Sequence, residues 1–357
     1  MYNLPYTNKQ INIPYLLKIG NGKTYKIGKY LIDKNLPDVA LFLGEGTEDL
    51  IGAELYRGFM DNDINIVHKQ FVSDISIENI TQTAFHLPPE TDVIVGIGGG
   101  KALDFAKYSA NLLRLPFVSV PTSTSNDGFC SPTSSLTVGN RRKTVKSGIP
   151  FGVVIDLDVI RSSPPIFFYS GLGDMVSKIT ALSDWKEAAN RKFERYSDFA
   201  AMLAYNSLDL LFIKHSFDIS APEFQRSLTT SLLMSGIAME VAGTSRPASG
   251  SEHLISHALD EVSTQPQMHG LQVGVASYLC ALLQNNSSAE NLQDILLKTG
   301  FFDFVGRNPF KKDEFLQALR LAPNIKRSFY TILSEADSYQ RAVEFMDKDK
   351  ILQKLIK

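Results

Sequence analysis

The chain has 357 residues, of which 44% are hydrophobic and 21% charged, and its 36 basic residues nearly balance its 38 acidic ones. This composition is typical of a globular protein, the length favours two domains, and a formal charge of −2 provides no broad basic surface for nucleic acid. The two cysteines, Cys130 and Cys280, are too few for a disulfide framework and favour a reducing compartment.

Neither the start of the chain nor its apolar stretches indicate a membrane protein. The segment MYNLPYTNKQINIPYLLKIG lacks the basic stretch, the sustained apolar core and the cleavage site of a signal peptide. The longest apolar-rich stretch, 271–283, is too short to cross a bilayer and includes Gln272 and Ser277. We therefore expect a cytoplasmic protein without a membrane span.

Residues 1–160 alternate between strand-like and helix-like patterns. Four short apolar runs are expected to form strands: DVALFLG, DINIVHKQF, DVIVGIGGG and PFVSVPT. After the first of them, TEDLIGAELYRGFM places Leu50, Ile51, Leu55 and Phe59 on one predicted helical stripe. This alternation predicts parallel βαβ units with ligands at the carboxyl ends of the strands. The segment LTVGNRRKTVKSG predicts a hairpin around Gly139-Asn140.

From residue 161 onward the patterns are helical. The pair Pro164-Pro165 is expected to end the strand region, and a turn at GLGD to start a helix with Asp174 at its beginning. Further helices are expected near 199–213, 224–241, 253–259 and 270–283. The sequence thus predicts an α/β domain with a parallel sheet at 1–160 and an all-α domain at 161–357.

Two loops that follow predicted strands are rich in groups that bind phosphate. In VIVGIGGGKALDFAKY four glycines precede a helix, so the backbone and the helix start could contact a diphosphate, although a tight turn without ligand would also explain them. In VPTSTSNDG, hydroxyl and polar side chains follow the next strand, and a capped turn is again the alternative. Two such loops after consecutive strands favour one shared ligand.

Four residues of the second half could hold a metal. His253 and His257 are four residues apart and share one face of a predicted helix. His269 and Asp174 could complete the three protein ligands that a catalytic divalent site uses. Each residue alone also has a structural explanation, as a helix cap or a polar helix end. The spacing by itself leaves both interpretations open.

Five segments in series resemble one known family. GIGGGKALDFAKY, PTSTSNDGFCSP, GLGDMVSK, SRPASGSEHLISHALD and MHGLQVG occur in the order seen in the iron-containing alcohol dehydrogenase superfamily. They are most similar to its sn-glycerol-1-phosphate dehydrogenase branch, with glycerol dehydrogenase as a close relative and dehydroquinate synthase as a more distant one. The resemblance covers roughly 92–275 and implies a dehydroquinate synthase-like fold and an NAD(P)-linked dehydrogenase.

The resemblance also implies a set of site residues. Asp174, His253 and His269 would bind the metal, usually Zn²⁺, although this donor set would also accept Fe²⁺, Ni²⁺ or Mn²⁺. Asp127 and His257 would serve substrate and catalysis without holding the metal. The expected nucleotide-binding residues are Gly98, Gly99, Gly100, Lys101, Asp104, Thr122, Ser123 and Ser125. One departure is Leu271, which stands where relatives commonly carry a glutamate that could support a metal ligand.

The implied reaction is the reversible reduction of dihydroxyacetone phosphate to sn-glycerol 1-phosphate, and we expect the chain to form a homo-oligomer. Arg246 or Lys146 could bind the phosphate, although either could be a solvated surface charge. Glu45 near the first strand slightly favours NAD over NADP. Three alternatives stay open: a dehydrogenase of glycerol or another unphosphorylated polyol, a dehydroquinate-synthase-like lyase, and a non-catalytic relative. Aspartate at position 174 argues against the lyase, which typically has glutamate there.

Overall fold

The computed structural model describes residues 11–139, 141–212, 217–326 and 328–357. Its first half is built on a six-stranded parallel sheet with the strand order β1-β8-β5-β4-β2-β3. The strands are β1 (Leu16–Gly20), β2 (Asp38–Leu43), β3 (Asn65–Phe71), β4 (Val93–Gly98), β5 (Phe117–Pro121) and β8 (Gly152–Asp156). The four predicted strands are therefore confirmed, and β1 is an additional edge strand.

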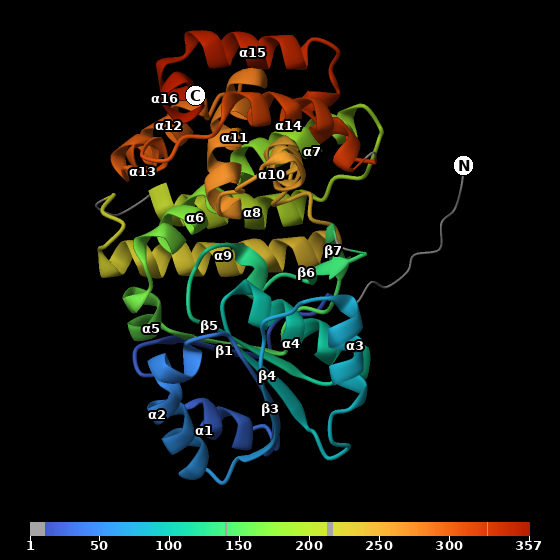
Figure 1. The fold of residues 1–357 in the computed structure, drawn as a ribbon, viewed down its shortest axis with the longest axis vertical. Helices are drawn as coiled ribbons and strands as arrows, with labels where there is room; N and C mark the ends of the chain where they lie inside the picture. The colour runs from blue at the N-terminus through green and yellow to red at the C-terminus, as the bar shows by residue number, and fades with distance from the viewer. Residues whose placement is uncertain (1–10, 140, 213–216, 327) are drawn as a thin grey trace.

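Helices cover both faces of this sheet (Figure 1). They are α1 (Ile27–Ile32), α2 (Thr47–Met60), α3 (Ile77–Phe85) and α4 (Gly100–Leu113). Successive residues of β2 point to opposite faces, so Leu41 packs in the cluster with α1 and α2 while Phe42 packs in the cluster with α3 and α4. The stripe predicted on α2 is wrong at one position, because Leu50 is 50% exposed and lies outside the buried face.

A two-stranded antiparallel hairpin leaves the sheet, as the sequence predicts. It consists of β6 (Thr133–Val138) and β7 (Arg141–Lys146), and Gly139 in its turn has a φ of +56°, which favours glycine. Asn140 of the predicted turn lies outside the described residues. The hairpin projects toward the second half of the molecule (Figure 1).

The second half is helical, as predicted, and stacks above the carboxyl edge of the sheet (Figure 1). Its described α-helices are α5 (Leu157–Ser162), α6 (Pro165–Val176), α7 (Lys178–Asn190), α8 (Asp198–Phe212), α9 (Pro222–Ala242), α10 (Ser251–Val262), α11 (His269–Leu283), α12 (Ala289–Lys298), α13 (Phe301–Gly306), α14 (Lys312–Ile325), α15 (Ser338–Lys348) and α16 (Lys350–Leu355). Two short 3₁₀ turns, η1 (Asp127–Phe129) and η2 (Ile332–Ser334), complete the elements. None of the described helices is long and apolar enough to cross a membrane.

The prediction of a turn at GLGD is wrong. Pro165 occupies the first turn of α6, where its fixed φ suits a helix and its missing N–H costs nothing, so the proline pair starts this helix. The GLGD segment lies inside α6, and Asp174 is near the end of the helix, which breaks at Ser177. Glycine usually weakens a helix, but here Gly171 and Gly173 let α6 pack closely against its neighbours.

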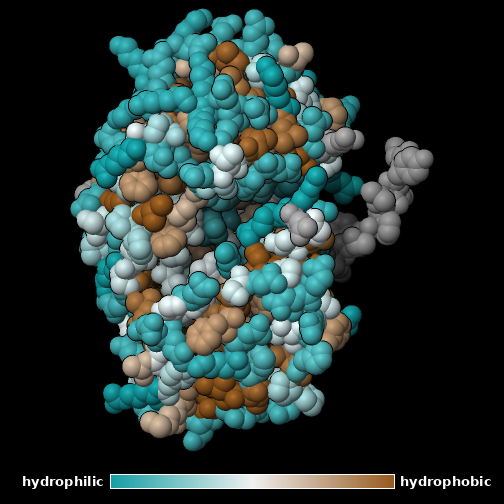
Figure 2. All heavy atoms as spheres, in the orientation of Figure 1, coloured by the Kyte–Doolittle hydropathy of each residue, from teal (hydrophilic) through white to brown (hydrophobic). Residues whose placement is uncertain are grey.

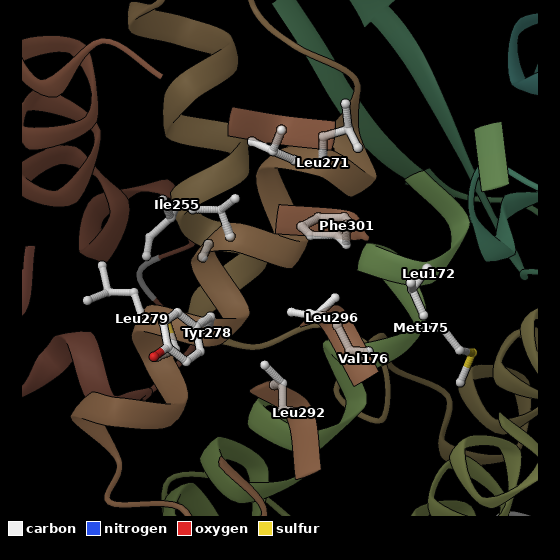
Figure 3. Packing of buried hydrophobic residues seen from close by; sticks show 14 of the residues in the cluster. Leu172, Met175, Val176, Ile255, Leu271, Tyr278, Leu279, Leu292, Leu296 and Phe301 are labelled. Atoms are coloured by element: carbon white, nitrogen blue, oxygen red, sulfur yellow. The ribbon is translucent and has the colours of Figure 1, made fainter. Parts of the chain in front are cut away.

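The largest apolar cluster lies in the helical half, and Figure 3 shows part of it. Leu172 and Met175 of α6, Ile255 of α10 and Phe301 of α13 pack in this core. Leu271 of α11 is only 3% exposed and belongs to the same cluster. The residue that departs from the resembled family therefore serves packing in this chain.

Candidate metal and nucleotide site

A cavity of about 230 Å³ lies between the sheet half and the helical half. Figure 2 shows the surface hollowed between these two halves, with hydrophilic residues in the recess. From the sheet half and its hairpin the lining includes Gly100, Lys101, Asp104, Asp127 and Arg142. From the helical half it includes Asp174, Ser249, His253, His257, His269 and Lys326.

The glycine loop lies at the point where the order in which the chain adds strands to the sheet reverses. Strands β2 and β4 are neighbours, and the chain proceeds from β2 toward one edge and from β4 toward the other. Gly98 ends β4 with a φ of +143°, and a Cβ there would lie 3.0 Å from the backbone nitrogen of Gly44, just after β2. Nothing lies within 4 Å of a Cβ built on Gly99 or Gly100. This topological switch point, followed by an open helix start at α4, is where doubly wound sheets bind nucleotides.

The polar loop after β5 is fastened next to the glycine loop. The backbone N–H of Thr122 donates to the carbonyl of Gly98 (3.1 Å), and the carbonyl of Ser125 accepts from Ser170 Oγ (2.9 Å). Thr122, Ser123 and Ser125 are all partly exposed, but the cavity lining begins one residue later, at Asn126. The predicted hydroxyls therefore lie beside the glycine loop and outside the cavity wall.

Lys107 of α4, which the sequence analysis treated only as a helix residue, fixes the rest of this loop. Its buried ammonium donates to the carbonyls of Gly128 (2.7 Å), Ser131 (3.2 Å) and Thr133 (2.6 Å). Burial lowers the pKa of Lys107, and the Asp104 carboxylate 3.5 Å away acts in the opposite direction. Lys107 thus holds the segment that carries Asp127 against α4.

The three predicted metal ligands lie together. Asp174, His253 and His269 each offer a ligand atom, and these atoms all lie within 4.8 Å of one another. Asp174 Oδ1 is 3.4 Å from His253 Nε2. One carboxylate and two imidazoles at this spacing fit a single divalent cation with positions left open toward the cavity. The residues come from the ends of three helices, α6, α10 and α11.

Other side chains orient both imidazoles. His253 Nδ1 lies 2.9 Å from Glu252 Oε1, and His269 Nδ1 lies 2.9 Å from Ser256 Oγ. The Ser256 hydroxyl donates to Gln272 Oε1 (2.6 Å). A hydrogen bond at Nδ1 leaves Nε2 of each ring to face a metal, which is the usual support around metal-bound histidines. The roles of Glu252, Ser256 and Gln272 were not predicted, although all three lie within the segments SRPASGSEHLISHALD and MHGLQVG.

The protonation states of Asp174 and His269 also suit a cation, while the hydrogen bonds of His253 to Asp174 and Glu252 outweigh burial and raise the pKa of His253. Burial and the nearby His253 lower the pKa of His269 to about 4, so this ring is neutral at physiological pH. Burial alone would raise the pKa of Asp174, but Lys178 and His253 outweigh it and hold the carboxyl ionised. A neutral imidazole and an ionised carboxylate are the forms that bind metal.

Asp127, which belongs to the sheet half, is held at the cavity by groups of the helical half. Its Oδ2 accepts hydrogen bonds from Lys178 Nζ (3.1 Å) and Ser235 Oγ (2.7 Å), and its backbone N–H donates to Asp174 Oδ2 (3.0 Å). Lys178 is fully buried, and its position four residues after Asp174 was the signal that could have identified it. Asp127 and the metal cluster therefore form one connected unit.

His257 lines the cavity beside the cluster without belonging to it. Its ring centroid is 6.5 Å from that of His253 and 5.8 Å from that of His269. Burial, followed by the charges of His269 and Lys326, lowers its pKa well below the usual range. His257 thus presents a neutral ring next to the cluster, and its contact with substrate stays a prediction.

Close backbone contacts hold the ligand-bearing helices together. A Cβ on Gly173 of α6 would lie 1.9 Å from the carbonyl oxygen of Gly270, and a Cβ on Gly270 would lie 1.8 Å from that of Ser170. The Gly270 N–H also donates to Ser170 Oγ (3.2 Å). Gly270 beside His269 and Gly173 beside Asp174 thus let α6 and α11 approach until their ligands meet.

Neither predicted phosphate-binding cation lies in the cavity wall. Arg246 is fully buried behind it, paired with Glu194 and donating to the carbonyl of Tyr330 (2.9 Å), so a solvated surface charge is excluded. Lys146 is exposed at the end of β7, outside the lining. The cationic residues in the lining are instead Lys101, Arg142 and Lys326. Glu45 is exposed directly after Gly44, beside the glycine loop.

Comparison with known proteins agrees with this site. The model of the iron-containing alcohol dehydrogenase family matches residues 18–164. The glycerol-1-phosphate dehydrogenase [NAD(P)+] of Methanococcoides burtonii is 32% identical over 96% of this chain and 97% of its own length. That of Metallosphaera sedula is 33% identical over 95% and 97%. A solved glycerol dehydrogenase from Schizosaccharomyces pombe shares the fold, with a TM-score of 0.77, 22% identity and coverage of 96% of this chain and 90% of its own.

The fold and the relatives together define an oxidoreductase of the dehydrogenase class. The chain belongs to the iron-containing alcohol dehydrogenase family. The members of this family are metal-containing, NAD(P)-linked dehydrogenases, and the resemblance seen in the sequence motifs is thereby confirmed.

Proposed function

We propose that the chain interconverts dihydroxyacetone phosphate and sn-glycerol 1-phosphate, using NAD(P)(H) and one divalent cation held by Asp174, His253 and His269. The observation that carries this proposal is the meeting of the three ligand side chains in a cavity that Gly100 of the open glycine loop also lines. Two relatives named for this activity, which are 32% and 33% identical over 96% and 95% of this chain, support the choice of substrate.

Each part of the chain has a defined task in this reaction. When bound, the divalent cation would polarise the substrate carbonyl and stabilise the developing alkoxide. The hydrogen bonds that His253 and His269 donate to Glu252 and Ser256 fix the two imidazoles before any ligand arrives, so the site needs little reorganisation. Asp127 keeps Oδ2 engaged with Lys178 and Ser235, which leaves Oδ1 to accept a hydrogen bond from a substrate hydroxyl. His257, neutral and lining the cavity, is positioned to assist proton transfer.

The glycine loop would hold the diphosphate of the nucleotide. The close contact of Gly98 with Gly44 leaves no room for a side chain, and the open surface at Gly99 and Gly100 lets the N–H groups that start α4 face a phosphate. Lys101 adds a positive charge to this surface. We favour NAD over NADP, because the exposed Glu45 would repel a 2′-phosphate. Among the possible metals we favour Zn²⁺, with Fe²⁺, Ni²⁺ and Mn²⁺ as the alternatives.

The proposal is tested by following NADH and NADPH absorbance with dihydroxyacetone phosphate and, separately, with dihydroxyacetone. Turnover that a chelator abolishes and added metal restores is expected for the phosphorylated ketone. His253→Ala should lose bound metal in elemental analysis, whereas His257→Ala should retain it and lose mainly turnover. Faster turnover of dihydroxyacetone would favour a polyol dehydrogenase, and no turnover of any ketone would favour a non-catalytic relative.

We also propose that the chain forms a homo-oligomer in the cytoplasm. Helix α8 exposes Phe199, Met202 and Tyr205, which are 56%, 48% and 55% exposed and three residues apart along one face. An exposed apolar face of this kind is typical of protein–protein contacts. Sedimentation analysis of the wild-type chain and of Tyr205→Glu tests the assembly, and a monomeric wild type would contradict it.

A further inference from the structure

One wall of the cavity carries a cation whose charge no nearby carboxylate balances. Lys326 follows the last residue of α14 and lines the cavity. Within the described part of the chain, no carboxylate oxygen forms an ion pair with its ammonium, which lies instead 4.8 Å from the ring centroid of Phe329. Burial and the neighbouring Arg246 lower the pKa of Lys326, with Glu252 acting weakly in the opposite direction. Lys326 is therefore a partly desolvated cation facing an open cavity.

A second cation lies on the same aromatic ring. The guanidinium carbon of Arg246 is 4.0 Å from the centroid of Phe329, so Arg246 and Lys326 share one ring. Arg246 uses Nη2 for Glu194 and for the carbonyl of Tyr330, while its buried Nε and Nη1 have no hydrogen-bond partner among the described residues. Among the described residues, Glu194 is the one carboxylate in ion-pair contact with either cation, and Glu252 acts on Lys326 only without such contact, which leaves an excess of positive charge on this wall.

A buried hydroxyl without a partner lies in the same wall. Ser249 is 5% exposed and lines the cavity, and its Oγ makes no hydrogen bond to a described residue. Buried polar groups in folded proteins nearly always have partners, so an unpaired donor at a cavity surface indicates a ligand that supplies the acceptor. An ammonium, a hydroxyl and an excess of positive charge together suit an anion with several acceptor oxygens.

We propose that Lys326 and Ser249 bind the phosphate group of the substrate, with Arg246 contributing its charge from behind the wall. The inference rests on the proposed function, because it identifies which part of that site distinguishes a phosphorylated ketone from a free one. His257 lines the same cavity, and besides burial both His269 and Lys326 lower its pKa, so it lies within electrostatic range of the metal cluster and of this wall. In this assignment the carbonyl end of a three-carbon ketone phosphate lies at the metal cluster and its phosphate lies at Lys326.

The substitution Lys326→Met tests the assignment by a difference between two substrates. It removes the charge and keeps most of the length, so kcat/KM for dihydroxyacetone phosphate should fall about tenfold to a hundredfold, mainly through KM. For dihydroxyacetone, which has no phosphate, kcat/KM should stay within about twofold. Lys326→Arg should recover part of the loss, and Ser249→Ala should show a smaller loss of the same kind.

Two controls make the test specific. Lys146→Met removes an exposed lysine outside the cavity and should leave kcat/KM unchanged for both ketones. Arg142→Met removes the exposed cation on the hairpin that faces the same cavity. Equal losses on both ketones in Lys326→Met, or a selective phosphate loss in Arg142→Met alone, would overturn the assignment. Melting temperatures of all variants show whether a loss reflects unfolding.

Binding of inorganic phosphate separates this inference from the proposed function. Calorimetry on the full wild-type chain should detect phosphate, and the signal should be lost in Lys326→Met and kept in Lys146→Met. If no ketone is turned over but this pattern of binding holds, the proposed function fails and the anion site stands. If wild type and Lys326→Met bind phosphate equally, or wild type binds none, the anion site is refuted.

Discussion

The two sides of the cavity build a binding site in opposite ways. On the sheet side the candidate nucleotide site consists largely of backbone, and Gly99 and Gly100 lie against open space. On the helical side the candidate metal site consists of side chains, with Asp174 and His253 buried and His269 half-buried, and the three come from three different helices. A backbone site depends on one strand–turn–helix unit, whereas a side-chain site depends on the packing of every helix that contributes to it.

This difference predicts which substitutions lower the stability of the fold and which weaken only the binding of a ligand. Each ligand imidazole is held by a second side chain, and that side chain is held in turn, as Ser256 is by Gln272. The glycine loop has one such constraint, the contact of Gly98 with Gly44. Changes around the metal cluster should therefore lower stability and metal affinity together, and changes at Gly99 should affect nucleotide binding alone.

The largest effect is expected from Gly270→Ala compared with Gly99→Ala. A methyl group on Gly270 would lie 1.8 Å from the carbonyl oxygen of Ser170, so α6 and α11 must move apart. We expect a loss of about 3 kcal/mol or more in the free energy of unfolding, together with lost metal. The methyl group of Gly99→Ala meets no atom within 4 Å, so the free energy of unfolding should stay within about 0.5 kcal/mol of the wild-type value. KM for the nucleotide should rise. Urea denaturation measures both, and equal stability of the two variants would contradict the comparison.

The next largest effect is a pH dependence of the folding stability, which arises from Asp184 behind the metal cluster. Asp184 Oδ2 accepts from the N–H of Ser251, the first residue of α10, and burial followed by Glu252 raises the pKa of Asp184 to about 6. A raised carboxyl pKa means that the folded chain binds this proton more tightly than the unfolded chain. The associated stability is present below about pH 4 and is lost as pH rises to about 6, with a change of about 3 kcal/mol.

Asp184→Asn should remove this part of the pH dependence. The variant should be less stable overall, because Asp184 accepts hydrogen bonds at both oxygens, from Ser251 and from Ile332 and Gln284, and an amide keeps only one acceptor. The measurement is the free energy of unfolding of both proteins between pH 4 and 7. If the two curves run parallel, the proton is not on Asp184.

A smaller effect is expected where only the orientation of a ligand is lost. Ser256→Ala removes the hydroxyl beside His269 Nδ1 and leaves all three metal ligands in place. It should weaken metal binding about tenfold to a hundredfold. Lys101→Met on the sheet side should leave metal affinity unchanged and raise KM for the nucleotide. Competition with a chromophoric chelator measures the affinities. Unchanged affinity in Ser256→Ala would show that the hydroxyl does not support His269.

Sequence patterns were sufficient for the sheet side and insufficient for the helical side, for the same physical reason. The strands and the glycine loop are contiguous, so β4 and the start of α4 could be recognised from one segment. The metal ligands were found by resemblance to a family, because His253 and Asp174 are distant in sequence and only tertiary packing joins them. Lys178, Glu252 and Lys326 were missed, since a charged residue in a helical pattern normally indicates a solvated face.

Arg246 and Leu271 show the limits of arguing from residue type. An arginine in a motif could face a ligand or solvent, but this one is buried beside Glu194 and Phe329. Leu271 was expected to matter through a missing carboxylate, yet it packs in the apolar core while Gln272 supports Ser256. Both outcomes depend on which face of a helix meets its neighbours, which a single-residue pattern does not determine.

The smallest expected effect concerns Cys130 in the sheet half and Cys280 in the helical half. Neither thiol should react with disulfide reagents while the chain is folded. Burial, partly offset by Lys107, raises the pKa of Cys130 to about 12, and burial raises the pKa of Cys280 well above its usual value. Only the thiolate reacts readily with disulfide reagents, so neither thiol should react in the folded chain at pH 8, and both should react in denaturant.

The rate at which each thiol becomes reactive then compares the two halves directly. Both thiols are buried in the same apolar cluster, but Cys280 lies in the middle of α11, the helix that carries His269, whereas Cys130 lies in the loop that Lys107 holds against α4. Labelling that requires local opening should therefore be faster at Cys130, because a loop opens at a lower free energy than a core helix. Mass spectrometry of each labelled peptide over time measures this order. Faster labelling of Cys280 would mean that the helical half opens first, and the metal cluster would then be the less stable of the two sites.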